Sequence, residues 1–238
     1  MSDSPNAKTA DTLFRELTEP FFKTLEISLG PFTSYSLMGD PKHLAFVLSR
    51  YKFVSKMLTG RQRVMEVGSG DGFGIPLVAD VVGQLYAVDW DQRFVDSNAR
   101  RLKHLSNVSF VMANLNSESP DLKVDAAYWV DVLEHLDADS ESTVMENILR
   151  CLPDDGVLIT GTPNKTASQH ASHQSKALHI NLKTMDELQT LMQRYFRNVF
   201  MFGMNDEVLH TGYAPMCHYI WSLAVGVRRA RGEKEQGE

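Results

Sequence analysis

Four glycines at alternate positions directly follow a short apolar run, and this pattern constrains the fold more than any other part of the chain. The apolar run covers residues 64–67 and contains one acid, Glu66. The glycines are Gly68, Gly70, Gly72 and Gly74. Glycine adopts positive φ angles without strain, and its lack of a Cβ lets a ligand lie directly against the backbone. The pattern therefore predicts a strand that turns abruptly into a helix, with a nucleotide-type cofactor bound at the turn.

The glycine spacing indicates which cofactor this turn would bind. A dinucleotide-binding G-x-G-x-x-G motif requires glycine three positions after Gly70, where this chain has Phe73. The segment instead resembles motif I of the class I S-adenosylmethionine-dependent methyltransferases, whose form is roughly hydrophobic-x-E/D-x-G-x-G-x-G. The resemblance implies an S-adenosylmethionine site that includes Glu66, Gly68, Ser69 and Gly70. The structural alternative is a glycine-rich turn that binds no ligand.

Length, composition and charge limit the class of protein. A chain of 238 residues is long enough for one sizeable α/β domain and short for two. Hydrophobic residues at 43% and charged residues at 23% are ordinary for a soluble globular protein. The formal net charge is −6, and a basic cluster occurs only at residues 228–231. Because an acidic chain repels phosphate backbones, we expect no nucleic-acid substrate; an RNA methyltransferase would need a basic groove, which is not evident.

The cysteines and the N-terminus predict a location. Only Cys151 and Cys217 occur, and neither belongs to a C-x-x-C motif, which is typical of a reducing compartment. Residues 1–11 lack the apolar core of a signal peptide, and residues 212–227 are too interrupted by polar residues and proline to span a bilayer. We therefore expect a cytoplasmic protein that does not insert into membranes. The oligomeric state is not predicted.

Apolar strand-like segments alternate with helical patterns along the chain. The predicted strands cover residues 63–67, 85–89, 108–112, 124–130, 156–162, 198–204 and 219–227. The predicted helices cover residues 12–27, 41–58, 75–82, 91–102, 140–151 and 184–195. This alternation is typical of parallel βαβ units, and the last two strands have no helix between them, which predicts an antiparallel end. The predicted fold class is α/β: a doubly wound, mostly parallel seven-stranded sheet with an antiparallel last strand, as in the Rossmann-like class I methyltransferases.

The domain organisation follows from these elements. We expect a single methyltransferase domain over residues 11–227. The first two helices have apolar faces that need a partner near the carboxyl edge of the sheet, so they should form a lid over about residues 11–59. Residues 1–10 and 228–238 contain almost nothing apolar to bury and are expected to be flexible.

Polar residues that end the second and third strands are candidates for cofactor binding, because ligands of open α/β sheets lie beyond the carboxyl ends of the strands. Asp89 ends the second strand, where a carboxylate accepts hydrogen bonds from ribose hydroxyls, and Trp90 would line the adenine. The family carries a polar acceptor for the adenine amino group after the third strand, with a backbone N–H beside it. Asn114 and Leu115 take these places. The alternatives are a helix cap at Asp89 and a simple turn at Asn114.

The segment after the fourth strand carries a second resemblance. Its sequence D-V-L-E-H, residues 131–135, resembles motif IV of the small-molecule methyltransferases related to the ubiquinone-biosynthesis O-methyltransferases. The glycine turn, the ribose acid and this run occur in the family's order and approximate spacing over residues 57–163. The resemblance implies that Asp131 faces the cofactor and that the cofactor is S-adenosylmethionine.

Two histidines are candidates for removing a proton from the acceptor. A hydroxyl becomes more nucleophilic as its proton leaves, and histidine has a pKa suited to that task near neutrality. His135 follows the fourth strand. His179 ends a long polar segment that opens with Thr162-Pro163-Asn164, and related small-molecule methyltransferases carry a similar run and histidine. The alternative for His135 is a capping or packing role.

A divalent-metal site is a further alternative for the same run. Asp131, Glu134 and His135 have the i, i+3, i+4 spacing that resembles the metal ligands of some ubiquinone-pathway and small-RNA methyltransferases. Many relatives share the run without using metal, so we predict no metal site.

The favoured function is methyl transfer from S-adenosylmethionine by direct in-line displacement. The acceptor is an oxygen of a small molecule or biosynthetic precursor, with nitrogen as the less favoured atom. Two alternatives stay open. An NAD-dependent oxidoreductase would bind NAD, and a non-catalytic S-adenosylmethionine-binding protein would bind S-adenosylhomocysteine without turnover.

Overall fold

A single twisted sheet forms the centre of the fold. The computed structural model describes residues 8–24 and 26–229. Its strands are β1 (Arg63–Val67), β2 (Gln84–Asp89), β3 (Val108–Met112), β4 (Ala126–Val130), β5 (Val157–Pro163), β6 (Phe196–Asn205), β7 (Val208–His210) and β8 (Tyr219–Val227). They form one sheet of eight strands in the order β3-β2-β1-β4-β5-β8-β6-β7. Strands β1 to β5 pair in parallel, and β8 runs antiparallel to β5 and β6. The predicted α/β fold class is confirmed, and the three-residue β7 is an additional edge strand.

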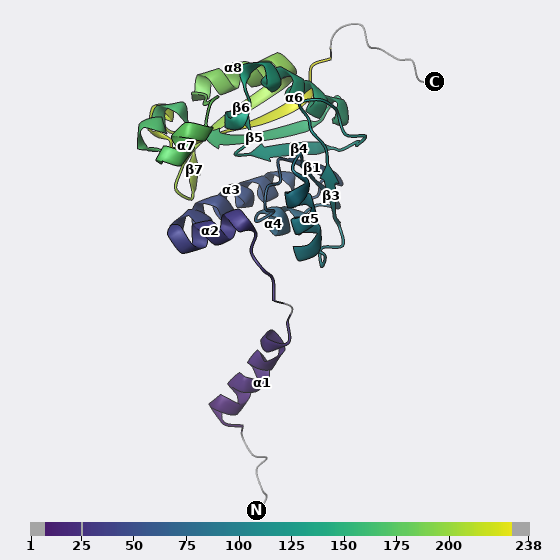
Figure 1. The fold of residues 1–238 in the computed structure, drawn as a ribbon, viewed down its shortest axis with the longest axis vertical. Coiled ribbons are helices and arrows are strands. Elements are labelled where there is room, and N and C mark those ends of the chain that lie inside the picture. Colours follow the sequence, from purple (N-terminus) through teal and green to yellow (C-terminus); the bar gives the residue numbers. More distant parts are fainter. Residues whose placement is uncertain (1–7, 25, 230–238) are drawn as a thin grey trace, which may run out of the picture.

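Helices cover both faces of this sheet (Figure 1). The α-helices are α1 (Ala10–Phe22), α2 (Pro31–Gly39), α3 (Lys42–Leu58), α4 (Ile75–Ala79), α5 (Gln92–Arg101), α6 (Ala138–Cys151), α7 (His173–Leu178) and α8 (Met185–Tyr195). Short 3-10 helices are η1 (Leu133–His135), η2 (Lys165–His170) and η3 (Ala214–Met216). No helix of the described residues is long and apolar enough to cross a bilayer.

Alternating side chains divide the core into one layer on each face of the sheet. Tyr128 of β4 packs with buried residues of α3 and α4, whereas its neighbour Trp129 packs with buried residues of α6 and α8. All five residues of β4 are buried. Side chains on a strand point alternately to opposite faces, so a strand covered on both sides must be apolar throughout. This explains the continuous apolar runs of the sequence.

The strand order reverses at β1, and this positions the site. β1 lies between β2 and β4. From β2 the chain continues outward to β3, and from β4 it continues outward to β5 on the other side of the sheet. In the register, Glu66 of β1 is opposite Ala87 of β2 and Tyr128 of β4. The segments that follow the three strands therefore meet at one edge of the sheet, which is where open α/β sheets bind ligands.

Two helices of the structure were not predicted. The segment that forms α2 begins with Pro31 and ends with Gly39, and its apolar residues do not follow a helical repeat. The segment that forms α7 is polar and only six residues long. Because sequence patterns detect helices through a buried apolar stripe, both segments resembled loops.

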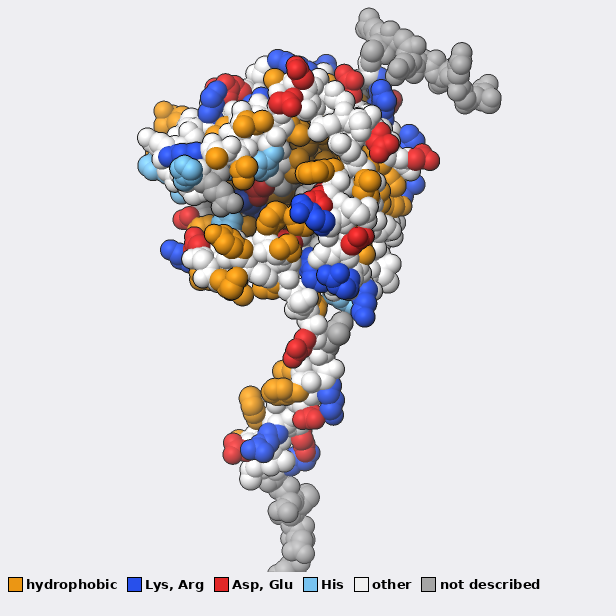
Figure 2. Space-filling view, in the orientation of Figure 1, with side chains coloured by type: hydrophobic (Ala, Val, Ile, Leu, Met, Phe, Trp, Pro, Cys, Tyr) orange, Lys and Arg blue, Asp and Glu red, His pale blue; other side chains and the backbone are white. Residues whose placement is uncertain are grey.

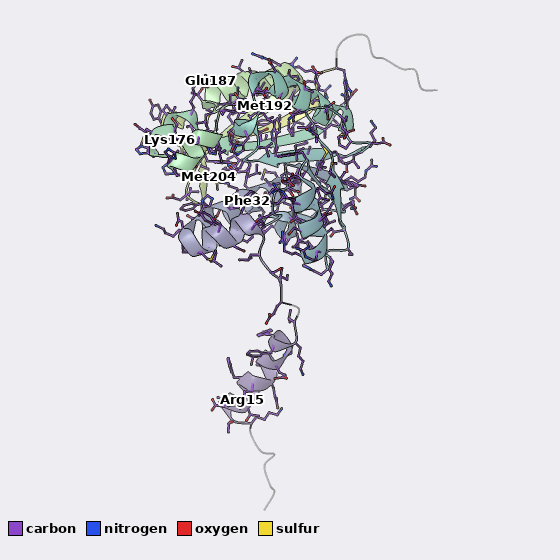
Figure 3. The ribbon with its side chains drawn as sticks, in the orientation of Figure 1. Arg15, Phe32, Lys176, Glu187, Met192 and Met204 are labelled. Carbon is purple, nitrogen blue, oxygen red and sulfur yellow. The ribbon has the colours of Figure 1, made fainter. Side chains whose placement is uncertain are left out.

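The N-terminal helix stands apart from the rest of the chain. α1 projects away from the sheet, and none of its residues is buried (Figure 1). Arg15 on α1 accordingly lies away from Phe32 and Met192 in the main body (Figure 3). The structure does not place α1 over the edge of the sheet. The helix ends at Phe22, and the described residues between it and Pro31 form no helix or strand. Residues of α3, the second predicted lid helix, and of α2, which was not predicted, line a cavity with the turn that follows β1.

The two predicted flexible ends fall mostly on residues 1–7 and 230–238, which lie outside the described residues. Arg228 and Arg229 are described, and they differ from the prediction of a free tail. Arg228 Nε donates to the Phe196 carbonyl oxygen at 2.8 Å, and Arg229 Nη1 donates to the Leu149 carbonyl oxygen at 3.0 Å. These two arginines therefore belong to the domain.

Candidate active site

The glycine-rich turn leaves β1 with a backbone that other residues could not easily adopt. Gly68 and Gly70 have φ angles of +72° and +50°. A Cβ on Gly68 would lie 2.5 Å from Val132 Cγ2, whereas a Cβ on Gly70 would meet nothing within 4 Å. The Gly68 N–H is held by the Val88 carbonyl oxygen at 2.9 Å. Gly68 is therefore required by packing, and Gly70 leaves bare backbone beside open space.

Asp89 connects the end of β2 to this turn. Its Oδ2 accepts a hydrogen bond from the Gly70 N–H at 2.8 Å, and its Oδ1 accepts one from the Asp91 N–H at 2.9 Å. Burial raises the pKa of Asp89, and these two backbone donors partly oppose that rise. The cap of α5 is Asp91, whose Oδ1 accepts from the Arg93 N–H. Asp89 therefore does not cap α5, which was the alternative role considered for it.

Three neighbouring cavities follow the sheet edge. The first cavity, of about 60 Å³, lies between the end of β2 and the segment after β3, and Trp90, Asn114 and Leu115 are part of its lining. The second cavity, of about 250 Å³, lies between α2, α3 and the turn Gly68–Asp71. The third cavity, of about 510 Å³, is lined by α3 and the segment after β5. Gly68 lines the first and second cavities. His43 and Asp131 line the second and third.

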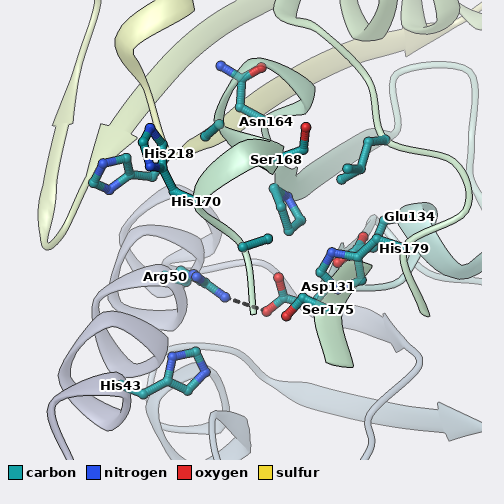
Figure 4. A pocket seen from close by; sticks show the side chains of 14 residues that line it. His43, Arg50, Asp131, Glu134, Asn164, Ser168, His170, Ser175, His179 and His218 are labelled. Atoms are coloured by element: carbon teal, nitrogen blue, oxygen red, sulfur yellow. Dashed lines mark hydrogen bonds and ion pairs between the residues drawn. The ribbon is translucent and has the colours of Figure 1, made fainter. Parts of the chain in front are cut away.

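The third cavity is the hollow on the face shown in Figure 2, with histidine side chains at its border. Its wall contains Arg50, whose Nη1 donates to Asp131 Oδ2 at 2.7 Å, as the dashed line in Figure 4 shows. The Arg50 guanidinium also lies over the Tyr219 ring, 4.1 Å from its centroid. Asp131 has a φ of +58°, which is uncommon for a residue other than glycine. Its backbone and its carboxylate are therefore both constrained at the junction between the cavities.

Glu134 is buried behind Asp131. Its Oε2 accepts a hydrogen bond from Thr162 Oγ1 at 2.9 Å, while Oε1 has no partner among the described residues. Burial, followed by the nearby charge of Asp131, raises the pKa of Glu134 to about 8. A buried carboxyl group with one unpartnered oxygen is available to a ligand in the third cavity, which it helps to line.

The two candidate histidines lie side by side. The ring centroids of His135 and His179 are 5.1 Å apart. His179 lines the third cavity, whereas His135 is exposed and its Nδ1 lies 3.1 Å from the Leu178 carbonyl oxygen. Burial, followed by the charge of His135, lowers the pKa of His179. The geometry therefore favours His179 for contact with a molecule in the third cavity, and it places His135 behind it.

The same residues form a possible metal-binding group, but in a different combination from the one considered on spacing. Ligand atoms of Glu134, His135 and His179 lie within 4.8 Å of one another. Asp131, the third residue of the i, i+3, i+4 pattern, is instead paired with Arg50. A carboxylate and two imidazoles are ligands that several divalent cations accept. Sequence spacing alone did not reveal His179 as a member, because it follows Glu134 by 45 residues in the chain.

This geometry agrees with a match to a known family. Residues 65–160, which include the glycine-rich turn, Asp89, Asn114 and Asp131, match the model of the family described as "Methyltransferase domain". Over these residues the chain is therefore similar to a methyltransferase domain. The strand order and the site at the reversal of the sheet are those expected for such a domain.

Curated proteins that are similar to this chain are named as methyltransferases. The chain is 31% identical over 157 residues to two proteins of Mycobacterium tuberculosis, from strains CDC 1551 and H37Rv, each named a probable S-adenosylmethionine-dependent methyltransferase. A protein of Mycolicibacterium smegmatis with a corresponding name is 30% identical over 115 residues. The matches to the M. tuberculosis proteins cover 65% of this chain and 55% of those proteins, so the chain spans about half the length of these relatives.

Solved structures show the same fold. The methyltransferase domain of a bacterial Hen1 protein superposes with a TM-score of 0.63 at 19% identity, covering 76% of this chain and 99% of that one. A DhpI complex with S-adenosylhomocysteine superposes with a TM-score of 0.58 at 16% identity, covering 91% and 95%. NodS, an N-methyltransferase of Bradyrhizobium japonicum, gives 0.59 at 15% identity in its S-adenosylhomocysteine complex, covering 82% and 92%.

The structure differentiates among the predicted cofactor residues. Glu66 lines none of the three cavities; it is buried below the turn, and burial raises its pKa to about 8 while the nearby Tyr51 and Tyr128 hydroxyls lower it. Asn114 is exposed, and its Oδ1 accepts from the Asn116 N–H at 3.0 Å. This is the turn contact that was considered as the alternative to cofactor binding. Trp90 is 69% exposed at the border of the first cavity. Gly68, Ser69, Gly70 and Asp131 line the second cavity.

Sequence patterns did not identify several residues that line the second cavity, among them Phe32, Thr33 and His43. Thr33 and Phe32 belong to α2, which was not predicted, and His43 belongs to the first turn of α3. None of them lies in a motif, because each reaches the cavity through the packing of α2 and α3 against the sheet edge. The position of Asp71 between two motif glycines was the one available signal for a further polar residue at the turn.

Proposed function

We propose that this chain transfers a methyl group from S-adenosylmethionine to an oxygen atom of a small molecule or biosynthetic precursor. Nitrogen is the second choice of acceptor atom. The observation that carries the proposal is the row of three cavities, in which Gly68 joins the first to the second and Asp131 joins the second to the third. A cofactor with an adenosine and an amino acid part needs two adjoining subsites, and its acceptor needs a third. The names of the mycobacterial relatives support this activity.

Each part of the cofactor has a place in this arrangement. The adenine would lie in the first cavity beside Trp90 and Leu115, and the ribose hydroxyls would donate to Asp89. The amino acid part would lie in the second cavity against the bare backbone of Gly68 and Gly70. The methyl group would then point toward Asp131 and the third cavity. Direct displacement requires mainly this alignment of acceptor, carbon and sulfur.

The alternative of an NAD-dependent oxidoreductase has less support. Phe73 stands where the dinucleotide motif needs its third glycine, and its side chain is in the lining of the second cavity. The third glycine of that motif lets the helix pack closely on the strand, and a phenylalanine at this position does not meet that requirement. The alternative of a non-catalytic binding protein is disfavoured by His179, which lies in the third cavity rather than in the core.

His179 is our candidate for the base, with His135 as its neighbour. Its lowered pKa keeps the imidazole neutral near pH 7, and a neutral imidazole accepts a proton from an acceptor hydroxyl. His135 then stands behind His179 and supports the ring position. The grouping of Glu134, His135 and His179 supports a second form of the reaction, in which a divalent cation acidifies the hydroxyl. Chelation of divalent cations separates the two: activity that survives EDTA favours the histidine base, and activity lost with EDTA and restored by added Mg²⁺ or Mn²⁺ favours the cation.

Calorimetry with S-adenosylhomocysteine and NAD tests the cofactor proposal. We expect heat of binding for S-adenosylhomocysteine and none for NAD. Asp89→Ala removes the acceptor of two ribose hydroxyls and should weaken S-adenosylhomocysteine binding about a hundredfold. Asp96→Ala, at an exposed position of α5, is the control and should bind as the wild type does. Binding of NAD, or equal affinity of the wild type and Asp89→Ala, would contradict the assigned site.

The acceptor is found by incubating the protein with methyl-labelled S-adenosylmethionine and fractionated metabolites. A cavity of about 510 Å³ suits a small molecule, and the net charge of −6 disfavours a nucleic acid. Small RNAs belong in the same screen, because a bacterial Hen1 domain shares the fold. Label on RNA and on no metabolite would contradict the small-molecule proposal.

A further inference from the structure

The first turn of α2 rests on the glycine-rich turn through one buried carboxyl group. Asp71 Oδ2 accepts a hydrogen bond from the Thr33 N–H at 2.7 Å, and both residues are buried. The N-cap of α2 is Gly30, which has no side chain to offer to the helix. The first N–H groups of a helix have no partner within it. Asp71 therefore supplies from the glycine-rich turn the capping contact that α2 lacks in its own sequence.

Gly30 makes this contact possible. A Cβ on Gly30 would lie 2.4 Å from Asp71 Cβ, so only glycine lets the two backbones approach this closely. Arg101 of α5 joins the same segments, because its guanidinium donates to the carbonyl oxygens of Asp71 and Ser28. The start of α2 and the turn are thus held together from both sides.

The rest of α2 has few contacts of this kind. Thr33 is its one buried residue, and Tyr35 and Met38 are 70% and 80% exposed. Phe32 packs on Phe94 of α5 with ring centroids 5.0 Å apart. A helix with so little buried surface depends on its individual contacts for its position. Among these contacts of α2, the one with Asp71 is polar and buried.

The position of α2 decides whether the second cavity is covered. Phe32 and Thr33 form one side of that cavity, and the turn Gly68–Asp71 forms the other. The turn is also tied to the body of the domain, because Asn98 Nδ2 donates to the Gly70 carbonyl oxygen at 2.8 Å. A molecule that occupies the second cavity contacts both sides, and Asp71 connects them directly.

We propose that Asp71 is a positioning residue that couples occupation of the glycine-rich turn to closure of α2 over the second cavity. The proposal rests on the proposed function, because it takes the ligand of this cavity to be S-adenosylmethionine or S-adenosylhomocysteine. The ligand contacts the turn and α2 together, and Asp71, which belongs to the turn, holds the first turn of α2. The coupling is reciprocal, so loss of the contact weakens ligand binding although Asp71 need not touch the ligand.

Hydrogen exchange of the α2 amides in the full chain, with and without S-adenosylhomocysteine, tests the coupling. In the wild type, the ligand should slow exchange over Pro31–Gly39. Asp71→Ala should still bind the ligand through Asp89, about tenfold more weakly, and α2 should lose its ligand-induced protection. Asp71→Asn keeps a side-chain oxygen that accepts from Thr33 N–H, and it should restore most of the protection.

A pair of glycine variants provides an independent test. Gly30→Ala drives the two segments apart without altering Asp71, and it should remove the ligand-induced protection of α2. Gly39→Ala lies at the other end of α2, where a Cβ would meet nothing within 4 Å, and it should behave as the wild type does. This pair gives the answer if Asp71→Ala does not fold.

Two results would overturn the inference, and they differ. If the ligand binds and protects α2 equally in the wild type, Asp71→Ala and Gly30→Ala, then Asp71 does not couple the two segments. If calorimetry shows no binding of S-adenosylhomocysteine to the wild type, the proposed function fails first, and the coupling fails with it.

Discussion

The proposed cofactor side and the proposed acceptor side of this site are built in different ways. The first cavity and one side of the second are formed mainly by the segments that directly follow β1, β2, β3 and β4, whereas α2 and α3 form the other side of the second. The third cavity collects Arg50 from α3, Asp131 after β4, His179 after α7 and His218 before β8. The difference shows that a cofactor site can be encoded in short motifs, whereas an acceptor site depends on how distant segments pack.

The comparison predicts that substitutions on the acceptor side alter turnover and leave cofactor binding intact. His179→Ala should lower kcat about a hundredfold or more, because it removes the candidate base, while the Kd for S-adenosylhomocysteine stays within about twofold. Turnover of the labelled acceptor and calorimetry measure the two quantities. His173→Ala, at an exposed position of α7 outside the third cavity, is the control. Full activity of His179→Ala would remove it from the mechanism.

Substitutions in the glycine-rich turn should have the opposite pattern. Gly68→Ala combines a positive φ with a clash against Val132, and we expect it to weaken S-adenosylhomocysteine binding at least tenfold and to lower the free energy of unfolding by about 1–3 kcal/mol. Gly60→Ala is the matched control, since Gly60 has a φ of +83° but open space around its Cβ position. It should lower stability less and leave binding unchanged. Equal binding losses in both variants, measured by calorimetry, would mean that backbone strain alone explains the effect.

A double-mutant cycle measures how much the ion pair at the junction between the two sides contributes to stability. Arg50→Met leaves the Asp131 carboxylate without its partner and should lower the free energy of unfolding by about 1–3 kcal/mol. Asp131→Asn is a suitable second variant, because asparagine tolerates positive φ angles. We expect the double variant to be less destabilised than the sum of the single variants in urea unfolding. Additive effects would show that the pair contributes nothing to stability.

A pH-dependent effect on stability is expected from Glu66 beneath the turn. Its pKa of about 8 in the folded chain lies above the usual value of 4.5, because burial favours the protonated form. Below pH 4.5 the folded and unfolded states both hold this proton. As the pH rises from 4.5 to about 8, the unfolded state releases the proton first, so Glu66 progressively reduces stability.

Glu66→Gln removes this pH dependence. The variant should gain stability relative to the wild type between pH 5 and pH 8, by about 3 kcal/mol. Urea unfolding at the two pH values measures the gain, with Glu118→Gln as an exposed control. A difference between variant and wild type that is the same at both pH values would contradict the protonated state of Glu66.

Several parts of the fold and site followed from local patterns. The continuous apolar runs predicted the strands of the sheet, because a strand covered on both faces is apolar throughout. The alternate glycines predicted the turn after β1, and Asp89 was predicted to end the second strand, where the structure shows it accepting from the Gly70 N–H. These features are readable because each depends on residues that are close in sequence or on one regular element.

Other parts were decided only when distant segments came together. Spacing grouped Asp131 with Glu134 and His135 as an alternative metal site. Packing instead pairs Asp131 with Arg50 and brings His179 to the two others. Packing also ties α2 to the glycine-rich turn through Thr33 and Asp71. Such contacts depend on the relative placement of whole elements, which no local periodicity records. The sequence by itself determined where a ligand meets the sheet, and the tertiary structure decided which side chains surround it.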